Sequence, residues 1–171
     1  MHKQGGFSLL ELICVMLILS ILAYFGSSHF LSLHQTTQDQ KTLKEAMAQL
    51  ADALLQARQL AVVSGQTAYV CGGQSCSGDW SSGFLLYQET EVEGSPSIYR
   101  NILLDGDIVL SWQGFPRNKQ SIEFTADGLS GYQNGTFQFC LGIWQAGLVL
   151  NQGGRFYTTS LTEKSSEVCD V

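Results

Sequence analysis

Apolar residues are concentrated near the N-terminus in one almost uninterrupted run. The segment Phe7–Phe25 is mostly apolar and contains a single charged residue, Glu11. At about 1.5 Å per residue, a helix of this length measures roughly 28 Å, enough to cross the hydrocarbon core of a bilayer. The pattern therefore predicts a transmembrane helix over residues 7–28.

The sequence becomes more polar after Gly26, but an apolar stripe with helical spacing continues. Its members recur every three or four residues. They are Leu43, Met47, Leu50, Leu54, Ala57 and Ala61. The spacing predicts a single helix over Phe7–Val63, with a bend at Gly26-Ser27-Ser28 and a stop at Ser64-Gly65. We expect its second half, residues 29–64, to be amphipathic and to pack on a sheet.

Beyond residue 65 the chain consists of short apolar or alternating runs separated by turn signals. The candidate strands are Thr67–Cys71, Gly83–Glu89, Ile98–Leu104, Ile108–Trp112, Ser121–Thr125, Thr136–Leu141, Gly147–Leu150 and Arg155–Thr159. Tight turns are expected at Asp105-Gly106, Asp127-Gly128, Asn134-Gly135 and Gly153-Gly154. The sequence predicts an α+β protein, in which one long N-terminal helix packs on a mainly antiparallel β domain at 65–171.

Four of the five cysteines lie in the predicted β domain, and the fifth, Cys14, lies in the apolar run. Four cysteines in a domain of this size indicate two disulfides and an oxidising compartment. Three pairings are open. We favour Cys71–Cys76, which brackets a short turn, and Cys140–Cys169, which would attach the C-terminal tail. Zinc is the competing interpretation, but there is no CxxC pair, so no metal site is predicted.

Glu11 distinguishes the apolar run from an ordinary membrane anchor. A secretory signal peptide would be cut after the run, near Ala23 or Gly26. In a signal-anchored soluble binding protein, the run would serve only as a tether. Neither alternative explains a carboxylate near the start of the span, since a charge in lipid is costly unless it has a partner. If cleavage exposes Phe7, the amino terminus of a neighbouring subunit is a candidate partner for Glu11.

Residues Gly6–Glu11 resemble the class III signal of type IV prepilins and type II secretion pseudopilins. In that family a dedicated peptidase cuts after the glycine and methylates the new N-terminus, usually a phenylalanine. The resemblance implies a leader at residues 1–6, a methylated Phe7 and an assembly role for Glu11. It also implies a single-pass protein of the bacterial inner membrane, with a periplasmic domain, that enters a pilus or pseudopilus.

The rest of the chain resembles the GspH/FimT group of minor pilins and pseudopilins. The motifs that carry the resemblance are Cys71, Trp80-Ser-Ser-Gly83, Phe84-Leu-Leu-Tyr87, Ile122-Glu-Phe124-Thr-Ala-Asp-Gly128, Gly135-Thr-Phe137-Gln-Phe-Cys140 and Asn151-Gln-Gly-Gly154-Arg155. The paired cysteines are more similar to the pilus branch. The resemblance implies a type IV minor pilin that primes assembly or sits at the tip, with minor and major pilins as partners. A type II secretion pseudopilin is the alternative.

The sequence offers little for catalysis. All three histidines precede residue 35, so the β domain lacks the general base of a Ser-His or Cys-His relay. Asp105 and Asp107 form the obvious carboxylate pair, but Leu-Asp-Gly-Asp between two apolar runs is more simply a hairpin turn. No P-loop or dinucleotide fingerprint occurs. We therefore predict no enzyme activity and no cofactor.

DNA is a disfavoured partner. Some FimT-like members bind DNA through a basic Gly-Arg-x-Arg motif, but here the stretch is Gly154-Arg155-Phe156-Tyr157, without the second arginine. The formal net charge of −6 also opposes binding to phosphates. If DNA were bound, the contacts would come from basic residues near aromatic side chains. These basic residues are Arg117, Lys119, Arg155 and Lys164, and the aromatic ones are Trp144, Phe156 and Tyr157.

Overall fold

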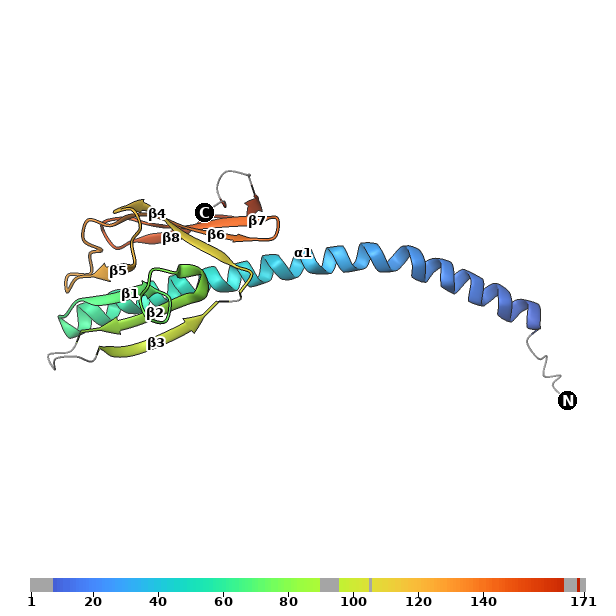
Figure 1. Cartoon of the computed structure of the whole chain (residues 1–171), viewed down its shortest axis with the longest axis horizontal. Helices are drawn as coiled ribbons and strands as arrows, with labels where there is room; N and C mark the ends of the chain where they lie inside the picture. The colour runs from blue at the N-terminus through green and yellow to red at the C-terminus, as the bar shows by residue number, and fades with distance from the viewer. Residues whose placement is uncertain (1–7, 90–95, 105, 165–168, 170–171) are drawn as a thin grey trace. The chain divides into compact units, whose positions relative to one another are not determined.

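The computed structural model describes residues 8–89, 96–104, 106–164 and 169, with the backbone alone for residues 25–34. The predicted cleavage site at Gly6 and Phe7, and also Asp105, lie outside the described residues. The chain divides into two compact units, Met1–Gln38 and Asp39–Val171. Figure 1 labels the helix and most of the strands along the chain.

Helix α1 spans Leu9–Ser64, as the apolar periodicity predicts for this stretch. It ends at Gly65, whose φ of 70° lies in the left-handed region that favours glycine. The N–H of Gly65 donates to the carbonyl of Ala61 at 3.0 Å and so closes the last turn. α1 continues through Gly26–Ser28, and the bend expected there stays a prediction.

The second unit contains two antiparallel sheets. The four-stranded sheet has the order β3-β2-β1-β5. Its strands are β1 (Ala68–Gly72), β2 (Gly83–Gln88), β3 (Ser97–Leu103) and β5 (Ser121–Phe124), with a 3₁₀ turn η1 (Trp80–Ser82) before β2. The other sheet has the order β4-β6-β7-β8, and β9 also pairs with β7. Its strands are β4 (Val109–Phe115), β6 (Asn134–Leu141), β7 (Trp144–Leu150), β8 (Phe156–Thr158) and β9 (Thr162–Glu163).

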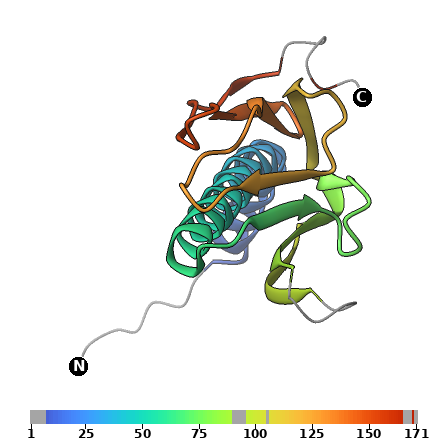
Figure 2. The same cartoon turned by 90° about the vertical axis from the view of Figure 1, so that its left-hand side faces the viewer.

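The core lies between the sheets and the part of α1 that belongs to the second unit. All six residues of the predicted stripe are buried, and Ala46 and Ala53 widen the buried face. They contact aromatic side chains from both sheets, among them Phe84, Phe124 and Phe137. In Figure 2 the strands lie beside this part of the helix. The predicted fold class, one helix packed on an antiparallel β domain, is confirmed.

The turn predicted at Asn134-Gly135 is wrong, because both residues belong to β6. Gly135 lies opposite Gly114 of β4. A Cβ on Gly114 would lie 2.6 Å from the Cα of Gly135, and the Cζ2 atom of Trp112 would lie 2.8 Å from a Cβ on either glycine. The two glycines therefore allow strands and a tryptophan ring to approach closely, a use of glycine that resembles a turn signal in sequence.

The hairpin predicted at Asp105–Asp107 is also wrong. Gly106 and Asp107 form a turn. However, β3 before it pairs with β2, while β4 after it pairs with β6. The segment thus carries the chain from one sheet to the other. The hairpin between β6 and β7 instead turns at Gly142 and Ile143, where Gly142 has a φ of 56°.

Candidate functional site

The apolar N-terminal part of α1 exposes its side chains in the first unit. The large hydrophobic residues between Leu9 and Tyr24 are 46–78% exposed. A contiguous apolar surface of this extent is typical of a protein or membrane contact.

No helix within the described residues is both long enough and apolar enough to span a membrane.

Glu11 lies in the first turn of α1 and is exposed. It is the one charged residue among Leu9–Tyr24. A carboxylate in the first turn of a helix is favoured by the partial positive charge of the helix N-terminus. Its position is therefore compatible with helix formation while the carboxylate remains accessible to a partner.

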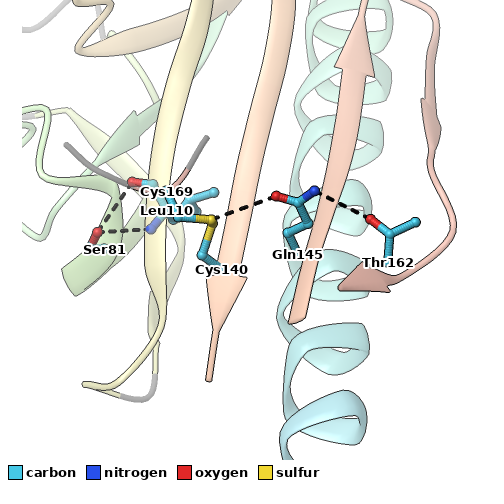
Figure 3. The surroundings of a disulfide bond; sticks show 6 residues. All are labelled: Ser81, Leu110, Cys140, Gln145, Thr162 and Cys169. Carbon is cyan, nitrogen blue, oxygen red and sulfur yellow. Dashed lines mark hydrogen bonds between the residues drawn. A yellow bond between two sulfur atoms is a disulfide. The ribbon is translucent and has the colours of Figure 1, made fainter. Parts of the chain in front are cut away.

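The disulfide pairing favoured from the spacing is confirmed. Cys71 pairs with Cys76, with Cα atoms 5.0 Å apart, and Cys140 pairs with Cys169, with Cα atoms 6.1 Å apart. The second disulfide ties Cys169 to Cys140 of β6 (Figure 3). Both pairs occupy the thiolates that a zinc site would need. Among the described residues, no three His, Cys, Asp or Glu side chains cluster as metal ligands would.

The Cys140–Cys169 disulfide is buried beside β7 and β9. Cys169 is 7% exposed, and its Sγ lies 3.9 Å from Oε1 of Gln145. Gln145 in turn donates from Nε2 to the hydroxyl of Thr162 at 3.5 Å. Figure 3 shows this row of contacts running across the sheet toward β9, a strand that the sequence did not predict. The covalent link holds Cys169 to β6, and the short strand β9 pairs with β7.

The Trp80-Ser-Ser-Gly83 motif joins the two sheets. The indole Nε1 of Trp80 donates to the carbonyl of Lys119 at 2.9 Å, and its ring packs edge-on against Phe137. The Ser81 hydroxyl donates to the carbonyl of Leu110 at 3.2 Å and accepts from the N–H of Leu110 at 2.9 Å (Figure 3). Ser81 therefore satisfies the N–H and the carbonyl that Leu110 presents at the unpaired edge of β4. The motif has a structural role.

The turn at Gly128 and the turn at Gly154, each part of one of the family motifs, lie against each other. A Cβ on Gly154 would lie 2.4 Å from the carbonyl oxygen of Gly128, and the Nε of Arg58 lies within 3.5 Å of that Cβ position. The buried hydroxyl of Ser130 donates to the carbonyl of Asn151 at 2.7 Å. These contacts show two turns packed closely against α1, which explains why glycine is needed at both positions.

Asp127 organises the first of these turns. Hydrogen bonds from the hydroxyl of Thr125 and then from the N–H of Leu129 lower the pKa of its carboxyl below the usual range. The pKa shift has a structural cause within a turn, and it does not indicate a catalytic acid.

The basic residues considered for DNA are spread along the sheet. Arg155 precedes Phe156, which pairs with Leu150 at the end of β7. Lys164 follows Glu163, which pairs with Trp144 at the start of β7. At about 3.3 Å per residue, the intervening strand is roughly 20 Å long.

The other two basic residues, Arg117 and Lys119, lie in the connection between β4 and β5. Of the three aromatic residues considered with them, only Tyr157 is largely exposed, at 64%, because Trp144 and Phe156 pack against the core. Lys164 lies at the opposite end of β7 from Arg155, so the four basic residues do not form a single patch.

The sequence matches two family models. The model described as type II transport protein GspH covers residues 46–154, more than half of the chain. The chain belongs to the GspH family. Residues 1–23 of this GspH-family chain match the prokaryotic N-terminal methylation motif, in agreement with the resemblance inferred from Gly6–Glu11. No curated protein matches the sequence.

The fold of this GspH-family chain is that of a solved pilin. Two crystal forms of the type IV minor pilin FimU of Pseudomonas aeruginosa strain PAO1 align with a TM-score of 0.52 and 18% identity. The alignments cover 71% and 75% of this chain and 92% of the FimU chains. At this identity the likeness establishes a common fold.

The sequence pattern does not indicate a pair of stacked tyrosines. Tyr69 of β1 and Tyr87 of β2 stack on each other, with ring centroids 5.1 Å apart. The two residues are far apart in sequence, and only the strand register brings them together.

Proposed function

We propose that this chain is a minor pilin, a structural subunit of a type IV pilus with no enzymatic activity. It primes pilus assembly or sits at the pilus tip together with other minor and major pilins. The observation that carries the proposal is the order of two parts: a methylation motif with an exposed apolar helix, followed by a GspH-family β domain. The pilin fold shared with FimU supports it.

The proposed pathway begins with cleavage. The prepilin peptidase removes residues 1–6 and methylates Phe7. The helix Phe7–Phe25 is held in the inner membrane, while the amphipathic half (29–64) and the β domain (65–171) lie in the periplasm. Two disulfides suit that oxidising compartment. On assembly, the apolar helix leaves the bilayer and packs among its neighbours in the filament.

Glu11 aligns the subunits in this proposal. Its carboxylate pairs with the N-terminal amine of an adjacent subunit. In an apolar filament core an unpaired charge is strongly unfavourable, whereas a paired one can define the register between helices. The exposure of Glu11 and its position in the first helical turn are consistent with such a contact.

The test compares variants in the host bacterium. Glu11→Ala should leave the amount of chain in the membrane fraction unchanged and should lower its amount in sheared filaments at least tenfold. Glu45→Ala is the matched control, because Glu45 is an exposed acid on α1 that pairs with neighbouring Lys41. Equal incorporation of Glu11→Ala and wild type would contradict the role of Glu11.

A pseudopilin of a type II secretion system is the second candidate. It is favoured by the description of the matching family as a transport protein. The paired cysteines favour the pilus branch instead. Deletion of the chain separates the two functions: loss of surface pili with normal protein secretion supports a minor pilin, and the reverse supports a pseudopilin. DNA uptake is the least favoured alternative, because the basic residues are dispersed and the chain is acidic.

A further inference from the structure

The outer surface of the four-stranded sheet carries a row of side chains contributed by all four strands. The register places Ile98 opposite Tyr87, Tyr87 opposite Tyr69, and Tyr69 opposite Glu123. Ala68 and Val70, which flank Tyr69 in β1, are fully buried in the core. Since side chains alternate along a strand, the row containing Tyr69 faces away from the core.

The middle of this row is aromatic. The rings of Tyr69 and Tyr87 are stacked with an interplanar angle of 16°, and both residues are half-buried. Ile98 beside them is 60% exposed. Tyrosine combines a large apolar area with a polar tip, and is enriched in protein interfaces for that reason. We call Ile98, Tyr87, Tyr69, Glu123 and Glu89 the tyrosine face.

Two carboxylates border the stacked rings. Glu123 lies directly opposite Tyr69, while Glu89 follows β2 and is exposed. Burial is the main cause that raises the pKa of the Tyr69 hydroxyl, and the negative charges of Glu89 and Glu123 raise it further. Glu89 also raises the pKa of Tyr87, again after burial. Both carboxylates therefore act on the electrostatic potential at the rings.

No cation of the sheet balances this charge on the outer surface. Among the described residues of β1, β2, β3 and β5, Arg100 is the only basic one. Arg100 lies opposite Leu86, a core residue, and its guanidinium pairs with Asp52 of α1. It is thus directed to the inner side of the sheet. The outer surface combines aromatic rings with negative charge and lacks a positive counterpart from its own strands.

At the Glu123 end of the row a partner would have to approach the face of the sheet, because the β5 edge is closed there. Oε1 of Gln133 accepts a hydrogen bond from the N–H of Glu123 at 3.2 Å. Gln133 is buried and occupies the position that the backbone of an added strand would take. The open surface beside Glu123 therefore presents side chains rather than a strand edge.

We propose that the tyrosine face binds an arginine-bearing segment of a neighbouring pilin subunit. An arginine guanidinium stacks on a tyrosine ring and can also donate to the carboxylates of Glu89 and Glu123. Arginine fits better than lysine because its planar group can do both at once. This interface rests on the proposed function, since the neighbouring subunit is present only if the chain enters a filament.

The experiment places a photoreactive benzoylphenylalanine at Ile98 of the full chain in its host bacterium. Sheared filaments are irradiated, and the cross-linked peptide is mapped by mass spectrometry. We expect an adduct with another pilin subunit, on a segment that contains arginine. The adduct should fall at least fivefold in the double variant Glu89→Lys, Glu123→Lys. Glu163→Lys, a charge reversal at an exposed position of β9, should leave it unchanged.

The milder double variant Glu89→Gln, Glu123→Gln should also lower the yield of the adduct. It shows whether the lysine variant loses the adduct for a reason other than misfolding. An adduct that persists in both double variants, or that maps to lipid or to a segment without arginine, would overturn the interface. These results would leave the minor-pilin proposal intact if the chain is found in the filaments. Absence of the wild-type chain from filaments would overturn both proposals.

Discussion

Several single residues have structural roles that their neighbours in the sequence do not indicate. Gly135 was expected to form a turn with Asn134, yet it lies in β6 opposite Gly114 of β4, and the two glycines let those strands approach closely. Tyr69 and Tyr87 are ordinary strand residues in sequence, and only the register makes them a stacked pair. Glu11, in contrast, is identified by sequence alone, because a lone acid in an apolar run is unusual wherever the run is placed.

The close approach at Gly114 predicts a marked loss of stability on substitution. In Gly114→Ala, the new Cβ would lie 2.4 Å from the carbonyl oxygen of Asn134, so the strands must separate. Overpacking of this kind costs about 1–3 kcal/mol in the free energy of unfolding. Gly106→Ala is the control, because nothing lies within 4 Å of its Cβ position. Denaturant unfolding of the purified full chain checks this, and equal stability of the two variants would show that the contact is not as tight as described.

The acids beside the tyrosines predict separate effects on the two rings. In Glu123→Gln the pKa of Tyr69 should fall toward its ordinary value, while that of Tyr87 should stay unchanged. In Glu89→Gln the pKa of both should fall. NMR of the ring resonances during an alkaline titration measures each residue. A Glu123→Gln variant with an unaltered Tyr69 pKa would contradict the arrangement.

The same raised pKa values determine how the stability of the folded chain changes with pH in alkaline solution. The folded-state pKa values of Tyr69 and Tyr87 lie above the ordinary value of about 10. Between the unfolded and the folded pKa, the folded chain binds more protons than the unfolded chain. The contribution of the two neutral tyrosines to the free energy of unfolding is therefore complete below about pH 10. It is lost as pH rises through their folded-state pKa values. Removing Glu89 should weaken this loss.

Among the elements, those determined by local periodicity are predicted best. The stripe from Leu43 to Ala61 identified the buried face of α1, because a long helix repeats its pattern many times. Eight strands were found close to their observed positions. The short β9 and the sheet to which each strand belongs were not found, since both depend on contacts distant in sequence. The turn at Gly142-Ile143 was missed for lack of a recognised turn pair.

The two disulfides stabilise different lengths of chain, which predicts unequal costs of removal. The loop closed by Cys140–Cys169 has a sequence separation of 29, and the loop closed by Cys71–Cys76 a separation of 5. Loop-closure entropy gives about 3.5 kcal/mol for the first and about 2 kcal/mol for the second. Replacing each pair with serine and measuring denaturant unfolding tests the order. A larger loss for the Cys71–Cys76 pair would contradict it.

At the scale of the whole molecule, the chain combines an apolar N-terminal helix with a GspH-family β domain on the pilin fold. The first part carries the methylation motif, and the second carries the disulfides and the tyrosine face. The sequence left three disulfide pairings open, and the pairing favoured from the spacing is the one observed. The sequence could not predict the tyrosine face, because side chains from four strands form that surface only after the sheet has folded.

The central claim is that the chain is processed and assembled as a pilin. The most direct measurement is mass spectrometry of the N-terminus of the chain recovered from membranes and sheared filaments of its host. The account predicts a chain that begins at N-methylated Phe7, and a Gly6→Ala variant that keeps residues 1–6. A wild-type chain that retains Met1, or that begins near Ser27 after removal of the apolar run, would contradict it.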